Sequence, residues 1–208
     1  VAELRFNAIS SYIVESKSLK LYLNSLNLTQ FASKNELIEL ISNDLSRVTQ
    51  MPVKIKLFSL SDPKAFGVTN LEGRVIDDLD IEINNYEYNP SFLQGSTLIN
   101  NNVEECLVSH VLKSNCLITS QPDWATVQIK YVGNKISEEA LLKYLVSFRS
   151  HNEFHEQCVE RIFCDIKYFC QPEKLTVYAR YTRRGGLDIN PWRSDFESNM
   201  VNNRLIRQ

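Results

Sequence analysis

The sequence predicts an α+β protein built from two modules, each an antiparallel sheet with a pair of helices on one face. Three observations predict this class. Strand-like alternation and helical i, i+3, i+4 spacing occupy successive blocks of the chain. The second half has the order strand, strand, helix, helix, strand, strand, and the first half resembles the same unit without its opening. A polar segment that contains Pro and Gly, residues 89–102, separates the two halves.

We therefore divide the chain into an N-terminal module at residues 1–97 and a C-terminal module at residues 98–208. A chain of 208 residues is long enough for two modules that each bury a core. The chain begins at Val1, inside a predicted strand, and we expect the first module to lack its N-terminal part.

The first half contains three predicted strands, at residues 3–10, 53–60 and 73–88. Residues 15–28 change to helical spacing with one apolar face. A second helix is marked more strongly, because Ser33 and Glu36 have the spacing of a capping box and apolar residues follow at helical intervals. Pro52 ends this helix.

The second half contains three further predicted strands, at residues 103–116, 124–132 and 174–182. The first two form a hairpin. Ser137 is the predicted cap of a helix that carries two glutamates in its first turn. Asn152 is the predicted cap of a second helix, which Pro172 stops. Its expected buried stripe is Phe154, Val159, Ile162, Phe163, Ile166 and Phe169.

Composition excludes several classes of function. A formal net charge of −2 lacks the basic excess of proteins that bind nucleic acid or membrane surfaces, so we expect neither partner. No apolar run approaches the roughly 20 residues needed to span a bilayer. Five cysteines, an odd number without framework spacing, are typical of a reducing compartment, so we expect a cytoplasmic protein.

Cys116 and Asp123 are the main catalytic candidates, because they lie where one predicted strand ends and the next begins. A thiolate attacks an electron-poor carbon, and a nearby protonated acid can deliver the proton that the attacked group needs. Asp123 precedes Trp124, against which it could be partly desolvated and keep its proton. A turn aspartate after Pro122 is the alternative. We expect the remaining cysteines in the core, namely Cys106, Cys158, Cys164 and Cys170.

His155 and Glu156 fall in the first turn of the predicted second helix. There the helix dipole favours an anion and disfavours imidazolium, so Glu156 should be charged and His155 neutral. Such a carboxylate can accept two hydrogen bonds from the amidine edge of a guanine-like base. Both residues could instead be solvated side chains at a helix start. A zinc site is a further alternative, because His151, His155 and Cys158 have i, i+4, i+7 spacing.

Two arginines and two glycines follow the last predicted strand in the segment YTRRGG. Arg183 and Arg184 could hold a phosphate while Gly185 lets the backbone approach it. A surface turn with solvated charges is the alternative. The sequence contains no GxGxxG motif, so a Rossmann dinucleotide domain is not expected.

Taken together, these segments resemble the NADPH-dependent 7-cyano-7-deazaguanine reductases, the nitrile reductases of queuosine biosynthesis, and in particular their longer, two-module branch. The resemblance covers most of the chain in the family's order. It rests on four segments: VESKSLKLYLNS at 14–25, LKSNCLITSQPDW at 112–124, YLVSFRSHNEFHEQCVERI at 144–162 and VYARYTRRGGLDINPW at 177–192.

The resemblance implies tandem tunnelling-fold modules that bind a purine-like ring, and we expect a homodimer. It implies that Cys116 attacks the nitrile carbon to give a covalent thioimide and that Asp123 protonates the nitrogen, with His155 as a third catalytic residue. Two NADPH molecules reduce the adduct to the aminomethyl product. Implied substrate contacts are Val14, Glu15, Ser16, His155 and Glu156. Implied NADPH contacts are Ser16, Lys17, Arg184 and Gly185.

Two other functions stay open at this stage. One is a zinc-dependent cyclohydrolase that acts on a pterin or purine on the same fold, with His151, His155 and Cys158 as ligands. The other is a module that binds a purine or a protein partner without catalysis, in which Cys116 is an inert core residue. Bound zinc would distinguish the cyclohydrolase from the reductase. An unreactive Cys116 thiol would distinguish the binding module from the reductase.

Overall fold

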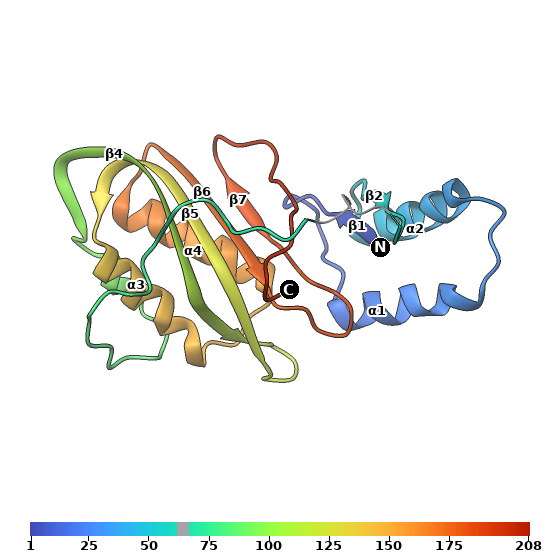
Figure 1. Ribbon diagram of the computed structural model, residues 1–208, viewed down its shortest axis with the longest axis horizontal. Coiled ribbons are helices and arrows are strands. Elements are labelled where there is room, and N and C mark those ends of the chain that lie inside the picture. The colour runs from blue at the N-terminus through green and yellow to red at the C-terminus, as the bar shows by residue number, and fades with distance from the viewer. Residues whose placement is uncertain (62–66) are drawn as a thin grey trace. The chain divides into compact units, whose positions relative to one another are not determined.

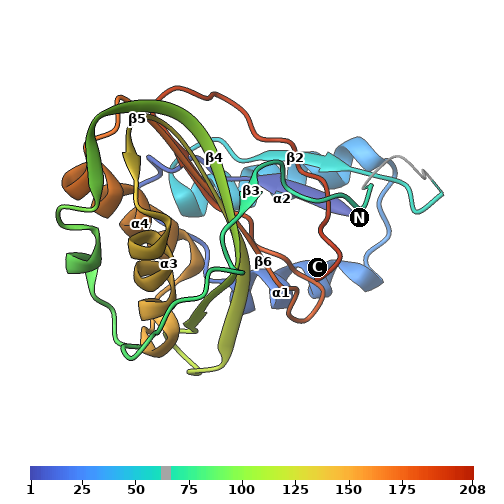
Figure 2. The same cartoon turned by 60° about the vertical axis from the view of Figure 1, so that its left-hand side comes forward.

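The computed structural model of the chain describes residues 1–61 and 67–208, and it divides into two compact units, Val1–Gly67 and Val68–Gln208. Figures 1 and 2 show the elements of both units. Within the described residues, no helix is long and apolar enough to cross a membrane.

Unit 1 pairs a two-stranded antiparallel sheet with two α-helices. Its elements are β1 (Ala2–Arg5), α1 (Ser16–Ser25), the short 3₁₀ helix η1 (Leu26–Leu28), α2 (Lys34–Thr49) and β2 (Lys54–Leu57). Ser33 caps α2, because its hydroxyl accepts a hydrogen bond from the amide of Glu36 at 3.1 Å. The Glu36 carboxylate accepts one from the amide of Ala32 at 2.7 Å. The predicted capping signal is therefore confirmed, with Ala32 as the reciprocal donor.

Unit 2 is built on a five-stranded sheet with the order β3-β4-β5-β6-β7. Its strands are β3 (Arg74–Val75), β4 (Thr97–Asn115), β5 (Pro122–Ile136), β6 (Lys174–Tyr181) and β7 (Trp192–Ser194). Neighbouring strands are antiparallel except for the short parallel pair β3–β4. The helices are the 3₁₀ segments η2 (Pro90–Leu93) and η3 (Ser147–Ser150), with α3 (Glu138–Val146) and α4 (His155–Cys170).

The core of unit 2 lies between this sheet and the helices α3 and α4, which cover one of its faces (Figure 2). On β5, Val127, Ile129 and Tyr131 are at most 1% exposed, as their alternation predicts. Ile162 and Ile166 of α4 are fully buried opposite the sheet. Burial of each such side chain stabilises the fold by about 1.5–3 kcal/mol. The predicted α+β class is thus confirmed.

The predicted boundary between the modules differs from the observed one, because residues 68–97 pack with unit 2 and not with unit 1. Ile76 and Leu93 are 2% and 0% exposed in the core that α3 and α4 cover. The segment predicted to separate the two modules, residues 89–102, contains η2 and the start of β4. Only Arg74–Val75 of the predicted strand 73–88 is a strand. The apolar residues of this region were misassigned because they serve the core of the second unit.

Candidate active site

Cys116 lies immediately after β4, in the loop that joins β4 to β5. The amide of Cys116 donates to the carbonyl of Gln121 at 2.8 Å, and its carbonyl accepts from the amide of Ser120 at 2.9 Å, so the loop is closed on itself. Burial raises the pKa of the thiol, but hydrogen bonds outweigh it. They come from the hydroxyl and amide of Thr119, the amide of Ile118 and the guanidinium of Arg184. The net effect lowers the pKa of Cys116 to about 7.

Asp123 is the second residue of β5 and is only 2% exposed. Trp124, its neighbour on the strand, is 37% exposed, because successive side chains of a strand point to opposite faces. The expectation that Trp124 desolvates Asp123 is therefore wrong. Instead, the Asp123 carboxylate lies inside the unit and faces Arg184, in the turn after β6, and His155, at the start of α4.

Arg184 reaches Gln121 and Asp123, in the hairpin that joins β4 to β5, from the turn after β6. Its Nε lies 3.0 Å from Oδ1 of Asp123, and its Nη2 lies 3.3 Å from Oδ2. Its Nη1 donates to the side chain of Gln121 at 2.7 Å. Gly185 and Gly186 have φ angles of 57° and 85°, and the amides of Arg184 and Leu187 bond each other's carbonyls. Both central residues thus take the positive φ of a type I′ turn, which glycine adopts without strain.

His155 is the first residue of α4 and is 9% exposed. Its Nε2 lies 3.5 Å from Oδ2 of Asp123. Its ring packs edge-on against Tyr181, with the ring centroids 4.1 Å apart. Cys116, Asp123, Arg184 and His155 therefore meet at one end of the sheet of unit 2, although they come from separate segments of the chain.

Glu156 follows His155 in the first turn of α4 and is partly exposed. Burial raises the pKa of its carboxyl, an effect that its own backbone amide and the nearby His155 only partly oppose. Burial thus outweighs these favourable groups in its effect on the pKa, and the expectation that Glu156 is charged stays a prediction. Within the described residues, no other side chain bonds this carboxylate, so its oxygens can accept hydrogen bonds from a ligand.

The helix α4 begins two residues later than predicted, with Phe154 and not Asn152 at the N-cap position, and the cause is a backbone bridge to the Cys116 loop. The amide of Asn115 donates to the carbonyl of His151 at 2.8 Å, and the amide of Glu153 donates to the carbonyl of Asn115 at 3.1 Å. Asn152 therefore lies in extended backbone and does not cap the helix; its side chain donates to Ser120 at 3.1 Å. This bridge fixes the start of α4 beside the end of β4.

Comparison with known proteins gives two matches to family models. Residues 1–57 match the model described as nitrile reductase, 7-cyano-7-deazaguanine-reductase N-term, and residues 122–200 match the one described as QueF-like protein. Together they cover more than half of the chain. The chain belongs to the QueF family. Family membership supports a role as a nitrile reductase of 7-cyano-7-deazaguanine in queuosine biosynthesis.

A solved structure is also similar to part of this QueF chain. It is the crystal structure of the archaeosine synthase QueF-Like in the apo form, at 17% sequence identity and a TM-score of 0.41. The match covers 49% of this chain and 100% of that one.

The remaining predicted residues of this QueF chain lie in unit 1, at the start of α1. Glu15 caps the helix: one carboxylate oxygen accepts from the amide of Lys17 and the other from the amide of Ser18, both at 2.8 Å. Although burial acts in the opposite direction, these hydrogen bonds lower the pKa of Glu15. Val14 and Ser16 are partly exposed and Lys17 is exposed. The assignment of Val14, Glu15, Ser16 and Lys17 to substrate or cofactor stays a prediction.

The residues proposed as alternative zinc ligands point to other partners. Nε2 of His151 lies 3.0 Å from Glu153, and His155 faces Asp123. Cys158 is fully buried, and burial raises its pKa to about 12, which disfavours the thiolate that zinc requires. Across residues 1–61 and 67–208, no three His, Cys, Asp or Glu side chains are grouped so that they could hold a metal ion.

The other cysteines of this QueF chain are not all core residues. Cys158 and Cys170 are buried, as expected, whereas Cys106 is partly exposed and Cys164 is exposed on α4. The structure also adds residues that the sequence did not indicate, namely Gln121, Tyr181 and the bridge between Asn115 and Asn152. No local pattern identifies them, since each acts through a partner distant in sequence.

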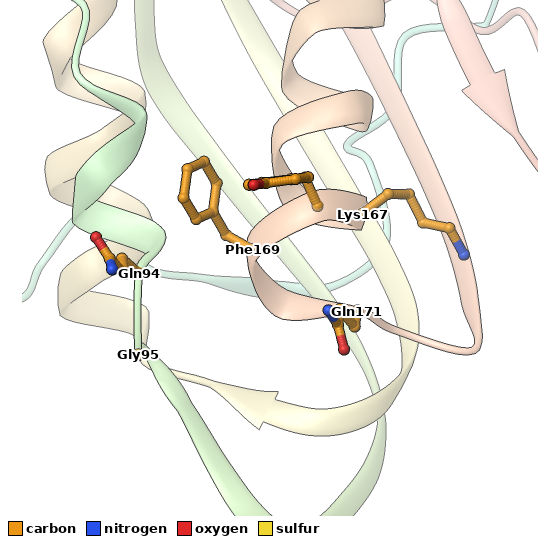
Figure 3. Close-up of a pocket in the computed structure, with 6 residues that line it drawn as sticks. Gln94, Gly95, Lys167, Phe169 and Gln171 are labelled. Atoms are coloured by element: carbon orange, nitrogen blue, oxygen red, sulfur yellow. The ribbon is translucent and has the colours of Figure 1, made fainter.

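A shallow pocket of about 510 Å³ lies elsewhere on unit 2, at the C-terminal end of α4 (Figure 3). It is lined by Gln94, Gly95, Lys167, Tyr168, Phe169 and Gln171. Its only charged residue, Lys167, is already bonded to Asp195 at 2.7 Å and to the carbonyl of Pro172 at 2.9 Å. The lining contains neither a nucleophile nor a free acid, so the cluster around Cys116 remains the candidate site.

Proposed function

We propose that this protein reduces the nitrile of 7-cyano-7-deazaguanine to the aminomethyl group of 7-aminomethyl-7-deazaguanine, with NADPH as reductant and a covalent thioimide on Cys116. The observation that carries the proposal is the thiol of Cys116, whose pKa is lowered to about 7 in the site that also contains buried Asp123. Such a thiol is about half thiolate at neutral pH, whereas an ordinary cysteine is a few per cent thiolate.

The covalent step needs one nucleophile and one proton, and Cys116 and Asp123 supply them. The Cys116 thiolate forms the S–C bond while one π bond of the nitrile breaks and its electron pair moves to nitrogen. That nitrogen takes a proton from Asp123, which holds the proton that the thiol has lost. The product is a neutral thioimide with one proton on nitrogen, so charge and atoms balance without an external acid.

Glu156 and His155 are the proposed contacts to the base. The free carboxylate of Glu156 can accept hydrogen bonds from the N1–H and 2-amino groups of the deazaguanine ring. His155 directly precedes Glu156 in the sequence, and its Nε2 lies 3.5 Å from the Asp123 carboxylate. Its ring packs against that of Tyr181. A base bound by Glu156 would therefore be anchored on the same helix turn that carries His155.

The residues proposed to bind NADPH include the cationic and backbone groups that contact phosphates. The turn Arg183–Gly186 has an exposed arginine and exposed glycine backbone, and Lys17 is exposed near the start of α1. Cationic side chains beside open backbone amides are the usual partners of phosphate. When bound, two NADPH molecules in succession supply the two hydrides that, with two protons, convert the thioimide to the amine and release the thiol. In unit 2, Arg184 and Gly185 are the residues that would contact NADPH, and in unit 1 Ser16 and Lys17 are separately proposed contacts.

Intact-mass spectrometry tests the proposal directly. The protein is mixed with 7-cyano-7-deazaguanine in the absence of NADPH, and the adduct is mapped by peptide analysis. We expect one adduct of the ligand's mass on Cys116, discharged when NADPH is added. Cys116→Ala is expected to form none, and Cys164→Ala serves as the matched control with an unchanged adduct. Binding of the nitrile without any adduct would reject the thioimide and leave a non-catalytic purine-binding module.

A further inference from the structure

The Arg184 guanidinium contacts the Cys116–Asp123 hairpin at several points. It makes two contacts to the Asp123 carboxylate, at 3.0 and 3.3 Å, and one to Gln121, at 2.7 Å. The carbonyl of Gln121 in turn accepts from the amide of Cys116 at 2.8 Å. Arg184 also contributes a hydrogen bond to the sulfur of Cys116. One side chain thus reaches the nucleophile, the acid and the loop between them.

The charge of Arg184 matches the charge of the pair that it contacts. Cys116 and Asp123 share one proton during attack on a nitrile, so together they carry one negative charge, on sulfur or on the carboxylate. Asp123 is 2% exposed and cannot rely on water to stabilise that charge. A guanidinium keeps its positive charge at all accessible pH values and can bond both acceptors.

The neighbouring elements offer no second permanent cation to the pair. His155 at the start of α4 and Tyr181 on β6 lie near the Asp123 carboxylate, and Glu156 follows His155. Arg180 on β6 bonds Tyr178, Asn202 and Gln208 instead, and the guanidinium of Arg149 lies over the rings of Tyr86 and Trp124. Lys113, on β4, donates instead to the side chain of Asn115 at 2.6 Å and to the carbonyl of Arg149 at 2.7 Å. Among the described residues of these elements, the counter-charge for Cys116 and Asp123 therefore falls to Arg184.

We propose that Arg184 is a positioning residue for the chemical step, which fixes the Cys116–Asp123 hairpin and balances its single negative charge before any cofactor binds. This inference deepens the proposed function and rests on Cys116 as its nucleophile. It gives Arg184 a role distinct from the NADPH contact that the family resemblance implies. A residue that only held a cofactor phosphate would have no effect on the thiol in the free protein.

The test measures alkylation of Cys116 by iodoacetamide as a function of pH, without nitrile or NADPH, with the modified peptide quantified by mass spectrometry. We expect Arg184→Met to shift the midpoint of the pH profile of alkylation upward by about one pH unit. This is the lower end of the effect of a neighbouring opposite charge. Arg184→Lys should restore part of the shift. Arg183→Met removes the same charge from the adjacent exposed position and should leave the midpoint unchanged. An unchanged midpoint in folded Arg184→Met would overturn the inference.

Thermal unfolding of each variant identifies the folded ones, and Arg184→Gln, which also removes the charge, replaces Arg184→Met if that variant does not fold. A raised midpoint in Arg184→Gln that is partly restored in Arg184→Lys would support the charge-balancing role, because lysine keeps the positive charge. An unchanged midpoint in Arg184→Gln, or a midpoint raised by the same amount in Arg184→Lys, would contradict it. The proposed function fails separately, through absence of the nitrile adduct in the wild-type protein, whatever the alkylation profile shows.

Discussion

Nε of Arg184 lies 3.0 Å from the buried carboxylate of Asp123, across 61 residues of sequence. This ion pair joins the turn after β6 to the first residues of β5, and Gln121 extends it to the Cys116 loop. The site is therefore assembled by long-range charge pairing as well as by the hairpin. It places a thiol whose pKa is lowered to about 7 near a carboxylate that is only 2% exposed.

The first prediction concerns the reactivity of Cys116 relative to Cys164. The pKa of Cys116 is lowered to about 7, whereas burial and nearby acidic groups raise that of exposed Cys164 above 9.0. At pH 7 we expect Cys116 to react with iodoacetamide about five- to tenfold faster, because its larger thiolate fraction outweighs its lower intrinsic nucleophilicity. Above pH 8 its rate should level off while that of Cys164 continues to rise. Equal rates at pH 7 would contradict a stabilised thiolate.

The second prediction concerns Asp123→Asn, which keeps the shape of the side chain and removes its charge. Arg184 then loses its ionic partner, and we expect the free energy of unfolding in urea to fall by about 1–3 kcal/mol. Loss of the acid should slow nitrile reduction at least about 100-fold, measured by NADPH consumption. Asp80→Asn is the control, since Asp80 is exposed and the change should stay within about 0.5 kcal/mol. Activity within twofold of wild type would exclude Asp123 as the acid.

The third prediction concerns stability and pH at Glu153, which is 9% exposed and precedes α4. Burial raises its pKa, but hydrogen bonds from Arg161, at 2.6 and 2.9 Å, and from His151 outweigh this and lower it below 4.5. A depressed folded-state pKa contributes stability above the unfolded value of about 4.3, and this is lost as pH falls through the folded value.

We therefore expect Glu153→Gln to cost about 1–2 kcal/mol at pH 7, a modest figure because the Arg161 side chain is 38% exposed. Near pH 3 the two proteins should differ by less. Urea unfolding at both pH values measures this, with the exposed Glu139→Gln as control. An identical cost at pH 7 and pH 3 would show that the carboxylate charge is not what stabilises the segment.

The sequence predicts the hairpin and the helices of unit 2 well, because their signals are local. Val127, Ile129 and Tyr131 alternate on β5, and Ser137 caps α3 as its position before two glutamates indicates. The hairpin alone brings Cys116 near Asp123, since a short loop joins the strands that carry them. These features follow from periodicity and capping, which depend on neighbours within a few residues.

What the sequence does not predict depends on partners far along the chain. Asn152 has the residue type of a cap, yet its backbone bridges Asn115 and the helix starts at His155. Trp124 adjoins Asp123 in sequence but points to the opposite face of β5. Arg184 carries no local sign that it pairs with Asp123. Each outcome is set by tertiary contacts that compete with a weaker local preference.

The last prediction concerns the pH dependence of substrate binding through Glu156. Burial raises the pKa of this carboxyl above 4.5, so the protonated form becomes important at a higher pH than for an ordinary glutamate. Only the carboxylate can accept both hydrogen bonds from the N1–H and 2-amino groups. Affinity should therefore be constant above the folded pKa, fall as pH decreases through it, and drop about tenfold per pH unit well below it.

Calorimetric titration of 7-cyano-7-deazaguanine into the Cys116→Ala protein measures this binding without covalent capture. Adding Glu156→Gln should weaken binding at pH 7 by about 10- to 100-fold, the loss of about 1.5–3 kcal/mol from hydrogen bonds to a charged acceptor. The affinity of this variant should no longer change between pH 7 and pH 4.5. Glu160→Gln, one turn further along α4 at a partly exposed position, is the control and should bind as tightly as its parent. Retention of the full acid-side loss in Glu156→Gln would assign the titrating group to another residue, because glutamine has no proton to gain over this range.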